Sequence, residues 1–144
     1  MASEGRAANP NLFKVMAADW LASESLQEEV FGPVGIIVVA ESVAQQRDIA
    51  RQISGQLTAT LHMDNGDTDD AKSLLPLLER KAGRVLVNGF PTGVEVADAM
   101  VHGGPYPAST NFGATSVGTM AIRRFTRPVC YQNVPDELLP REFA

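Results

Sequence analysis

Residues 34–40 read Val-Gly-Ile-Ile-Val-Val-Ala, and they carry the strongest structural signal in the chain. The run is apolar and rich in β-branched side chains, and the dipeptide Gly32-Pro33 marks a turn directly before it. A continuous apolar run of this length is typical of a strand that is buried on both faces, as in a parallel sheet. The sequence therefore predicts a buried strand at 34–40.

A helix is predicted directly after this strand. The Ser42 hydroxyl is suited to cap its first turn. Gly55 is placed to end it, because glycine accepts the left-handed conformation that often follows a last turn. A second strand is then predicted at 56–63.

A second helix is predicted from about residue 64 to about residue 82, with acidic residues at its start. Carboxylates suit the positive N-terminal end of a helix. Gly83 is placed to end this helix, and Pro76 is expected to kink it or to shift its start. A third buried strand is predicted at 84–88.

Strands that alternate with helices through short connections indicate an α/β fold with a parallel sheet. Right-handed crossovers put both helices on one face and leave the other face to be covered by something else. A further strand is predicted at 11–17. The remaining sequence is less regular: we expect a disordered lead-in at 1–10, an irregular path at 89–118, a short helix at 116–125 and a final strand at 127–132.

Composition excludes several classes of function. The formal net charge is −5, from 17 acidic and 12 basic residues, which argues against nonspecific nucleic-acid binding. No apolar run approaches the ~20 residues of a membrane-spanning helix. Cys130 is the single cysteine, so no internal disulfide forms, and a reducing cytoplasmic setting is expected. Arg123, Arg124 and Arg127 are interpreted as a solvated helix face or a subunit salt bridge.

The hexapeptide Glu28-Glu29-Val30-Phe31-Gly32-Pro33 is the strongest candidate for chemistry. A carboxylate at this place can accept two hydrogen bonds from a vicinal diol, as acidic residues do with ribose. The phenyl ring can pack on a flat ligand ring. These residues also fit a plainer interpretation, a solvated acid pair and a core phenylalanine. Taken alone, they favour that plainer interpretation.

The remaining candidates are interpreted as structural. His62 reads as a satisfied strand histidine, whereas His102, in a glycine-rich loop, keeps a minority chance of a functional contact. The acidic residues at 64–70 lack the spacing of a calcium loop and are interpreted as a capped, solvated helix start. No metal site is expected. Cys130 is interpreted as an inert, packed thiol.

Beyond single residues, several motifs in order resemble the aldehyde dehydrogenase superfamily, and most closely its branch that oxidises α-ketoglutaric semialdehyde (2,5-dioxopentanoate). The resemblance covers nearly everything from about Gly5 to the end of the chain. The motifs are Glu28-Glu29-Val30-Phe31-Gly32-Pro33, Gly55-Gln56-Leu57-Thr58-Ala59-Thr60, Glu79-Arg80-Lys81-Ala82-Gly83-Arg84-Val85, Asn88-Gly89-Phe90-Pro91-Thr92-Gly93-Val94-Glu95-Val96, Met100-Val101-His102-Gly103-Gly104-Pro105-Tyr106-Pro107-Ala108 and Arg127-Pro128-Val129-Cys130-Tyr131-Gln132.

The resemblance implies the C-terminal part of an aldehyde dehydrogenase: a partial catalytic domain at 11–115, and an oligomerisation arm and tail at 116–144 that make a homo-oligomer. It implies that Glu29 binds the nicotinamide-ribose hydroxyls and that Phe31 packs beside the nicotinamide. Residues toward the aldehyde entrance are Asn88, Phe90, Thr92 and Gly93.

The family's reaction needs a cysteine thiolate and a glutamate base, both far upstream of the hexapeptide, and a Rossmann half that binds the dinucleotide. None of these has a match here, so the chain alone is expected to be inactive and to bind no cofactor, whereas the complete enzyme uses NAD or NADP. Two alternatives stay open: a natural short interaction module that uses the dehydrogenase's subunit-contact surface, and, more remotely, an unrelated α/β binding domain.

Overall fold

A computed structural model describes residues 8–143 of the chain. The apolar run forms strand β2 (Val34–Val39), which pairs in parallel with β1 (Asn11–Met16) in unbroken register from Asn11 opposite Val34 to Met16 opposite Val39. Helix α1 (Ala17–Leu21) and a 3₁₀ turn at Glu24–Leu26 connect the two strands. Both strands therefore occur as the sequence predicts.

Helix α2 (Val43–Gln52) begins at the predicted cap: the Gln45 N–H donates to Ser42 Oγ at 3.3 Å. The prediction for its end was wrong. The helix stops at Gln52, and Ile53 leaves it in an extended conformation. Among the described glycines only Gly118 has a positive φ, so Gly55 does not act as a left-handed cap.

Strands β3 (Gln56–Leu61) and β4 (Ala82–Val87) form a second parallel pair, with Ala59 opposite Val85. Helix α3 (Thr68–Leu78) connects them. It starts at Thr68 rather than at about residue 64, contains Pro76 within its last turn, and ends at Leu78, short of the predicted residue 82. Gly83 lies inside β4 rather than at a helix end, which corrects the second stop prediction.

The hydrophobic core lies between α2, α3 and the second strand pair. Ala50, Leu74 and Leu78 are buried, and five partly buried residues pack against them: Ile53, Ala59, Leu61, Leu77 and Val85. Helices α2 and α3 thus contribute to one core.

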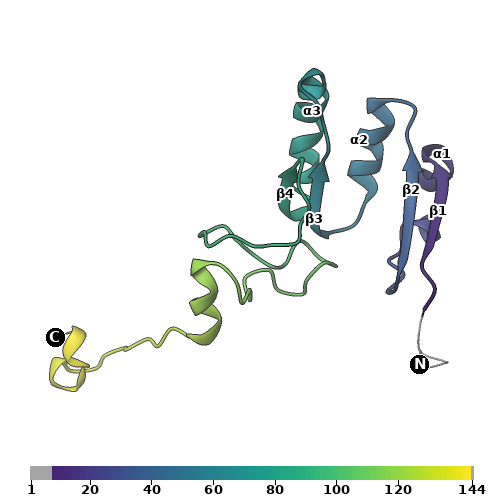
Figure 1. Cartoon of the computed structure of the whole chain (residues 1–144). Helices are drawn as coiled ribbons and strands as arrows, with labels where there is room; N and C mark the ends of the chain where they lie inside the picture. Colours follow the sequence, from purple (N-terminus) through teal and green to yellow (C-terminus); the bar gives the residue numbers. More distant parts are fainter. Residues whose placement is uncertain (1–7, 144) are drawn as a thin grey trace, which may run out of the picture.

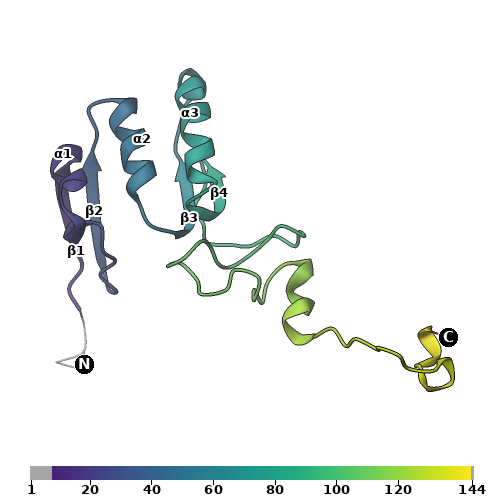
Figure 2. The ribbon, with the colours of Figure 1, turned by 180° about the vertical axis from the view of Figure 1, so that it is seen from behind.

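The predicted single sheet is replaced, within residues 8–143, by two separate two-stranded sheets. Helix α2 lies between the two strand pairs in the front and back views (Figures 1 and 2). Ile36 and Ile37 in β2 are 40% and 47% exposed, so the expectation that this strand is buried on both faces was wrong. The described residues supply too few layers to cover it.

Three glycines bring the loop after residue 101 against the amino ends of β3 and β4. A Cβ atom added to Gly55, Gly83 or Gly104 would overlap a backbone carbonyl oxygen, of Pro105, Gly103 and Gln56 respectively. We call these three residues the glycine seam. Local sequence rules read the first two as helix ends, whereas the fold needs them for close approach of two backbones.

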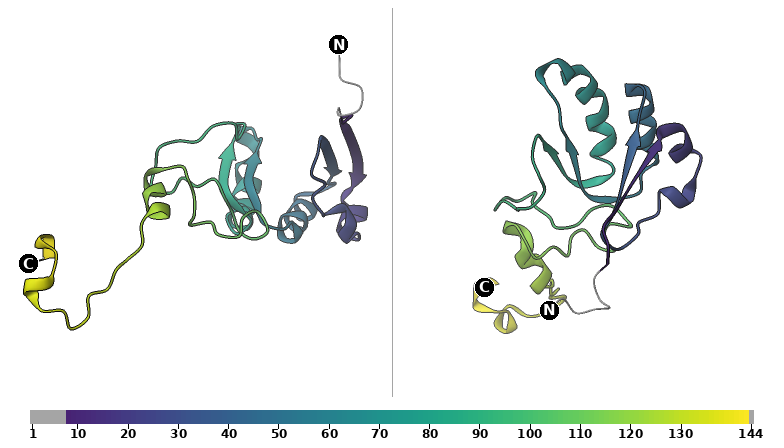
Figure 3. Two further views of the ribbon diagram at one scale, coloured as in Figure 1. Left: turned by 90° about the horizontal axis from the view of Figure 1, so that it is seen from below. Right: turned by 45° about the vertical axis from the view of Figure 1, so that its right-hand side comes forward.

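After this loop, the chain from the 3₁₀ helix that starts at Thr119 onward extends away from the strand pairs (Figures 1 and 3). The helix predicted at 116–125 appears as a 3₁₀ helix at Thr119–Phe125, and short 3₁₀ turns follow at Asp136–Leu138 and Arg141–Phe143. The strand predicted at 127–132 does not form, and within residues 8–143 no strand pairs with this segment.

Some predictions concern other parts of the chain. Residues 1–7 of the expected disordered lead-in lie outside the described residues, and residues 8–10 have no regular secondary structure. No helix within residues 8–143 is long and apolar enough to cross a membrane. The division into a domain at 11–115 and an arm at 116–144 stays a prediction.

Candidate functional site

Asn88 follows the carboxyl end of β4 and closes it onto β3. Its backbone has a φ of 52°, and its N–H donates to the Leu61 carbonyl at 2.8 Å. Its side chain pairs with the backbone of Met63: Nδ2 donates to the carbonyl at 2.9 Å, and Oδ1 accepts from the N–H at 2.8 Å. Asn88 therefore continues the pairing of the two strands beyond their ends.

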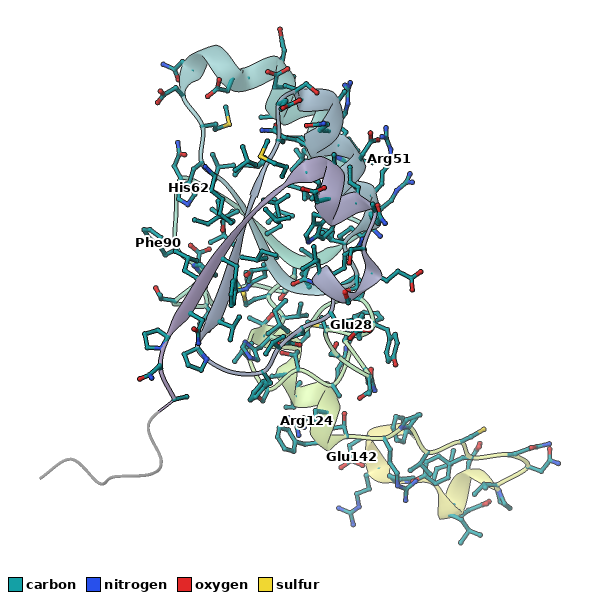
Figure 4. The ribbon with its side chains drawn as sticks, turned by 90° about the vertical axis from the view of Figure 1, so that its right-hand side faces the viewer. Glu28, Arg51, His62, Phe90, Arg124 and Glu142 are labelled. Atoms are coloured by element: carbon teal, nitrogen blue, oxygen red, sulfur yellow. The ribbon has the colours of Figure 1, made fainter. Side chains whose placement is uncertain are left out.

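The segment after Asn88, residues 89–93, forms what we call the return loop. Phe90 is 78% exposed, and its ring centre lies 5.6 Å from that of His62 (Figure 4). The Thr92 N–H donates to the Phe90 carbonyl at 2.9 Å, which makes a tight turn. Gly93 ends the loop beside β4, where its carbonyl accepts a hydrogen bond from Arg84. The structure thus brings together the four residues predicted for the aldehyde entrance.

An open recess of about 350 Å³ adjoins this region, lined by His62, Met63, Asp64, Asp67 and Asn88. Its two carboxylates are engaged in the start of α3: Asp64 accepts from the backbone, and Asp67 Oδ2 accepts from the Asp64 N–H at 2.9 Å. The acidic run is thus a capped helix start, as predicted. Within residues 8–143, no three metal-ligating side chains gather at one place.

The hexapeptide at 28–33 lies in an exposed loop directly before β2. Glu28 and Glu29 are exposed, and Phe31 is 98% exposed. A carboxylate and a free phenyl face that no described residue covers fit a diol and a flat ring. They therefore suit the nicotinamide-ribose end of a dinucleotide, although the sequence holds no glycine-rich phosphate loop.

Trp20 fixes the entry to the hexapeptide, at the place where Trp20-Leu21 with Leu26 in the sequence predicts an anchored short turn or helix. Its indole is 5% exposed and donates through Nε1 to the Leu26 carbonyl at 3.1 Å. The Gln27 side chain donates back to the Trp20 carbonyl at 3.2 Å. These two hydrogen bonds close a clamp one residue before Glu28.

The structure does not bring the two groups of candidates together. Glu29 and Phe31 precede the amino end of β2, whereas Asn88 follows the carboxyl end of β4, and both pairs point the same way in Figure 1. Figure 4 shows Glu28 well apart from His62 and Phe90. The described chain alone therefore assembles no single pocket from them.

Two further candidates, His102 and Cys130, lie away from the loop that follows Asn88. His102 precedes the glycine seam, so it lies near the amino end of β4, with its N–H bonded to Thr115 Oγ1 at 3.1 Å. Cys130 is exposed. The expected packed thiol was wrong in that respect, because no strand among residues 8–143 pairs with the segment that carries it.

Comparison with known proteins identifies the chain. No family model matches it. It is 57% identical over 129 residues, 90% of its length, to alpha-ketoglutaric semialdehyde dehydrogenase 2 of Azospirillum brasilense. It is 54% identical over 134 residues, 92% of its length, to alpha-ketoglutaric semialdehyde dehydrogenase of Acinetobacter baylyi. The chain therefore belongs to the aldehyde dehydrogenase family and is similar to a C-terminal portion of these two enzymes. It spans about a quarter of their length.

Proposed function

We propose that this chain acts as the C-terminal part of an NAD(P)-dependent aldehyde dehydrogenase that oxidises 2,5-dioxopentanoate to 2-oxoglutarate. The identity of 54–57% to two enzymes named for that semialdehyde, over nine-tenths of the chain, carries the proposal. The nicotinamide supplies a hydride acceptor when it is bound. The residues of this chain contribute binding and positioning.

Glu29 is proposed to accept hydrogen bonds from the two ribose hydroxyls, and Phe31 to pack beside the nicotinamide. Their exposure supports these roles, because both groups are free to meet a ligand. Asn88, Phe90, Thr92 and Gly93 are proposed to border the aldehyde entrance. For Asn88 the hydrogen bonds to Met63 favour a bracing role over direct contact with the aldehyde.

The chemical step is proposed to use groups outside this chain. A cysteine thiolate adds to the aldehyde carbon, loss of hydride leaves a thioester, and a glutamate-activated water releases the acid and the thiolate. The one cysteine here, Cys130, is exposed and lies between the 3₁₀ helix that ends at Phe125 and the 3₁₀ turn that starts at Asp136. The chain alone is therefore proposed to be inactive.

A second candidate is a natural short interaction module that uses the dehydrogenase's subunit-contact surface, with a second copy of the chain as partner. The tail favours it, since it encloses a recess of about 350 Å³ lined mainly by apolar residues: Val129, Tyr131, Asn133, Val134, Leu139 and Phe143. Under either candidate the tail serves as the oligomerisation arm.

The test is NAD(P)H formation from 2,5-dioxopentanoate, measured by absorbance for three proteins. These are the chain alone, the intact Acinetobacter baylyi relative, and a chimera in which this chain replaces the matching quarter of that relative. We expect turnover from the last two only. A rate of NAD(P)H formation that rises in proportion to the concentration of the chain alone would contradict the proposal. In that case the variant Cys130→Ser would show whether Cys130 is the nucleophile.

Glu29→Gln in the chimera should raise KM for NAD(P)⁺ about tenfold, because a carboxylate accepts stronger hydrogen bonds than an amide. Glu28→Gln is the matched control, since its carboxylate is also exposed and one residue away. Equal effects of both substitutions would remove the specific role of Glu29. An active relative beside an inactive chimera would argue against the enzymatic proposal and for the interaction module.

A further inference from the structure

Arg84 is the one charged residue within β4 (Ala82–Val87). Side chains alternate between the faces of a strand, and the adjacent Val85 packs into the core beneath the helices. Arg84 therefore points to the opposite face of the strand pair. A charge in an otherwise apolar strand requires partners, and the return loop supplies them.

The guanidinium of Arg84 donates two hydrogen bonds to carbonyls of this loop. Nη1 lies 2.6 Å from the Gly93 oxygen, and Nη2 lies 3.3 Å from the Pro91 oxygen. A planar fork of donors suits two separate acceptors, whereas an ammonium group is a single point charge. The positive charge is thereby directed at the backbone and not at a ligand.

Asn88 fixes the other end of the same loop through its hydrogen bonds to Met63. The return loop is thus tied to β3 at its start and to β4 at its end. Between these ties lies Phe90, which is exposed and contacts His62. With both ends of the loop tied, the backbone that carries the Phe90 ring is restrained, although Phe90, Pro91 and Thr92 are solvent-exposed.

We propose that Arg84 is a positioning residue for aldehyde selectivity: it holds the return loop in the conformation that presents Phe90. The inference rests on the proposed function, which sets this loop at the aldehyde entrance. Arg84 acts through the loop and touches no substrate. Its loss therefore weakens aldehyde binding more than it slows the chemical step.

The first experiment measures amide hydrogen exchange at Thr92 in the purified chain. Thr92 is suited because its N–H is bonded within the loop. Arg84→Gln should speed exchange there about tenfold, since charge-assisted hydrogen bonds are lost, and Arg84→Lys should give a smaller change. Arg80→Gln is the matched control, on an exposed arginine after α3. The Asn88 amide, bonded to Leu61, shows whether the strands remain folded.

The second experiment measures kcat and KM in the chimera. Arg84→Gln should raise KM for 2,5-dioxopentanoate several-fold with little change in kcat, and should lower its preference over pentanal. Unchanged Thr92 exchange would overturn the anchoring, and unchanged preference with faster exchange would overturn the role in selectivity. An inactive wild-type chimera would instead refute the proposed function, while the exchange result would still decide whether Arg84 anchors the loop.

Discussion

The two strand pairs are alike in length and direction but differ in what covers them. In the second pair, β3–β4, the helices cover one face, and the return loop is tied by Arg84 to the other. In the first pair, β1–β2, Leu12 and Phe13 are 71% and 57% exposed. The backbone pairing of a strand is thus satisfied independently of the burial of its side chains.

The more apolar of the two pairs is the less covered one. β2 is continuously apolar, as in strands that are covered on both faces, whereas β3 reads Gln-Leu-Thr-Ala-Thr-Leu. The composition of β2 therefore matches an environment that residues 8–143 do not supply. In the proposed complete enzyme, the polypeptide that corresponds to the rest of the relatives' length supplies it.

The largest loss of stability is expected from a substitution that disrupts the second strand pair, β3–β4. Gly83→Ala puts a Cβ atom against the backbone of Gly103, which cannot move aside as a side chain can. We expect a loss of about 3 kcal/mol or more in the free energy of unfolding, measured by denaturant titration with far-UV circular dichroism. Gly66→Ala is the control, with nothing within 4 Å of the added atom. Equal free energies of unfolding for the two variants would refute the close backbone approach at Gly83.

Leucine truncation compares the two pairs directly. Leu74 is 9% exposed in the core of the second pair, and Leu12 is 71% exposed in the first. Leu74→Ala should lower the free energy of unfolding by about 2–3 kcal/mol through lost contacts and a cavity. Leu12→Ala should lower it by less than about 1 kcal/mol. A larger effect at Leu12 would mean that the first pair is covered in solution.

The Trp20 clamp allows a smaller test within the first pair. Trp20→Phe removes the N–H that binds the Leu26 carbonyl and leaves an aromatic ring in place. It should lower the free energy of unfolding by about 1 kcal/mol and speed amide exchange around residues 27–29. If the amides of residues 27–29 exchange at the same rate in the wild-type chain and in the variant, the clamp does not hold the hexapeptide.

The smallest effect on stability is expected at the uncovered face of β2. Ile37→Ser should change the free energy of unfolding by less than about 0.5 kcal/mol, because the side chain is half exposed. It should weaken self-association, since exposed apolar surface drives contact between copies. Sedimentation velocity measures this. A wild-type chain that stays monomeric at high concentration would contradict the expectation.

Local patterns predicted the order of strands and helices well. The apolar run of β2 and the hydroxyl cap at Ser42 depend on residues close in sequence, and both occur as predicted. Gly55 and Gly83 were misread for the opposite reason. Their role depends on backbone atoms at Pro105 and Gly103, twenty or more residues away, which no local rule contains.

The sequence names candidate site residues, whose roles stay a prediction, but it does not give their arrangement. The motif at 88–93 proved to be one tied loop, yet the carbonyl partners of Arg84 are backbone atoms that leave no trace in the sequence. The strand predicted at 127–132 shows the same limit. Its pairing requires a neighbour, and the pattern of one chain does not state whether that neighbour is present.

The glycine seam has a consequence for how the gene can vary. Every codon change that replaces glycine adds at least a Cβ atom, so no point mutation offers a milder step at Gly55, Gly83 or Gly104. A saturation map of the chain should therefore show these three positions as intolerant, together with Gly118, whose positive φ and close carbonyl neighbours also exclude a side chain, beside a permissive Gly66 and Gly32. The contact between the loop and the strand ends would be inherited as a unit.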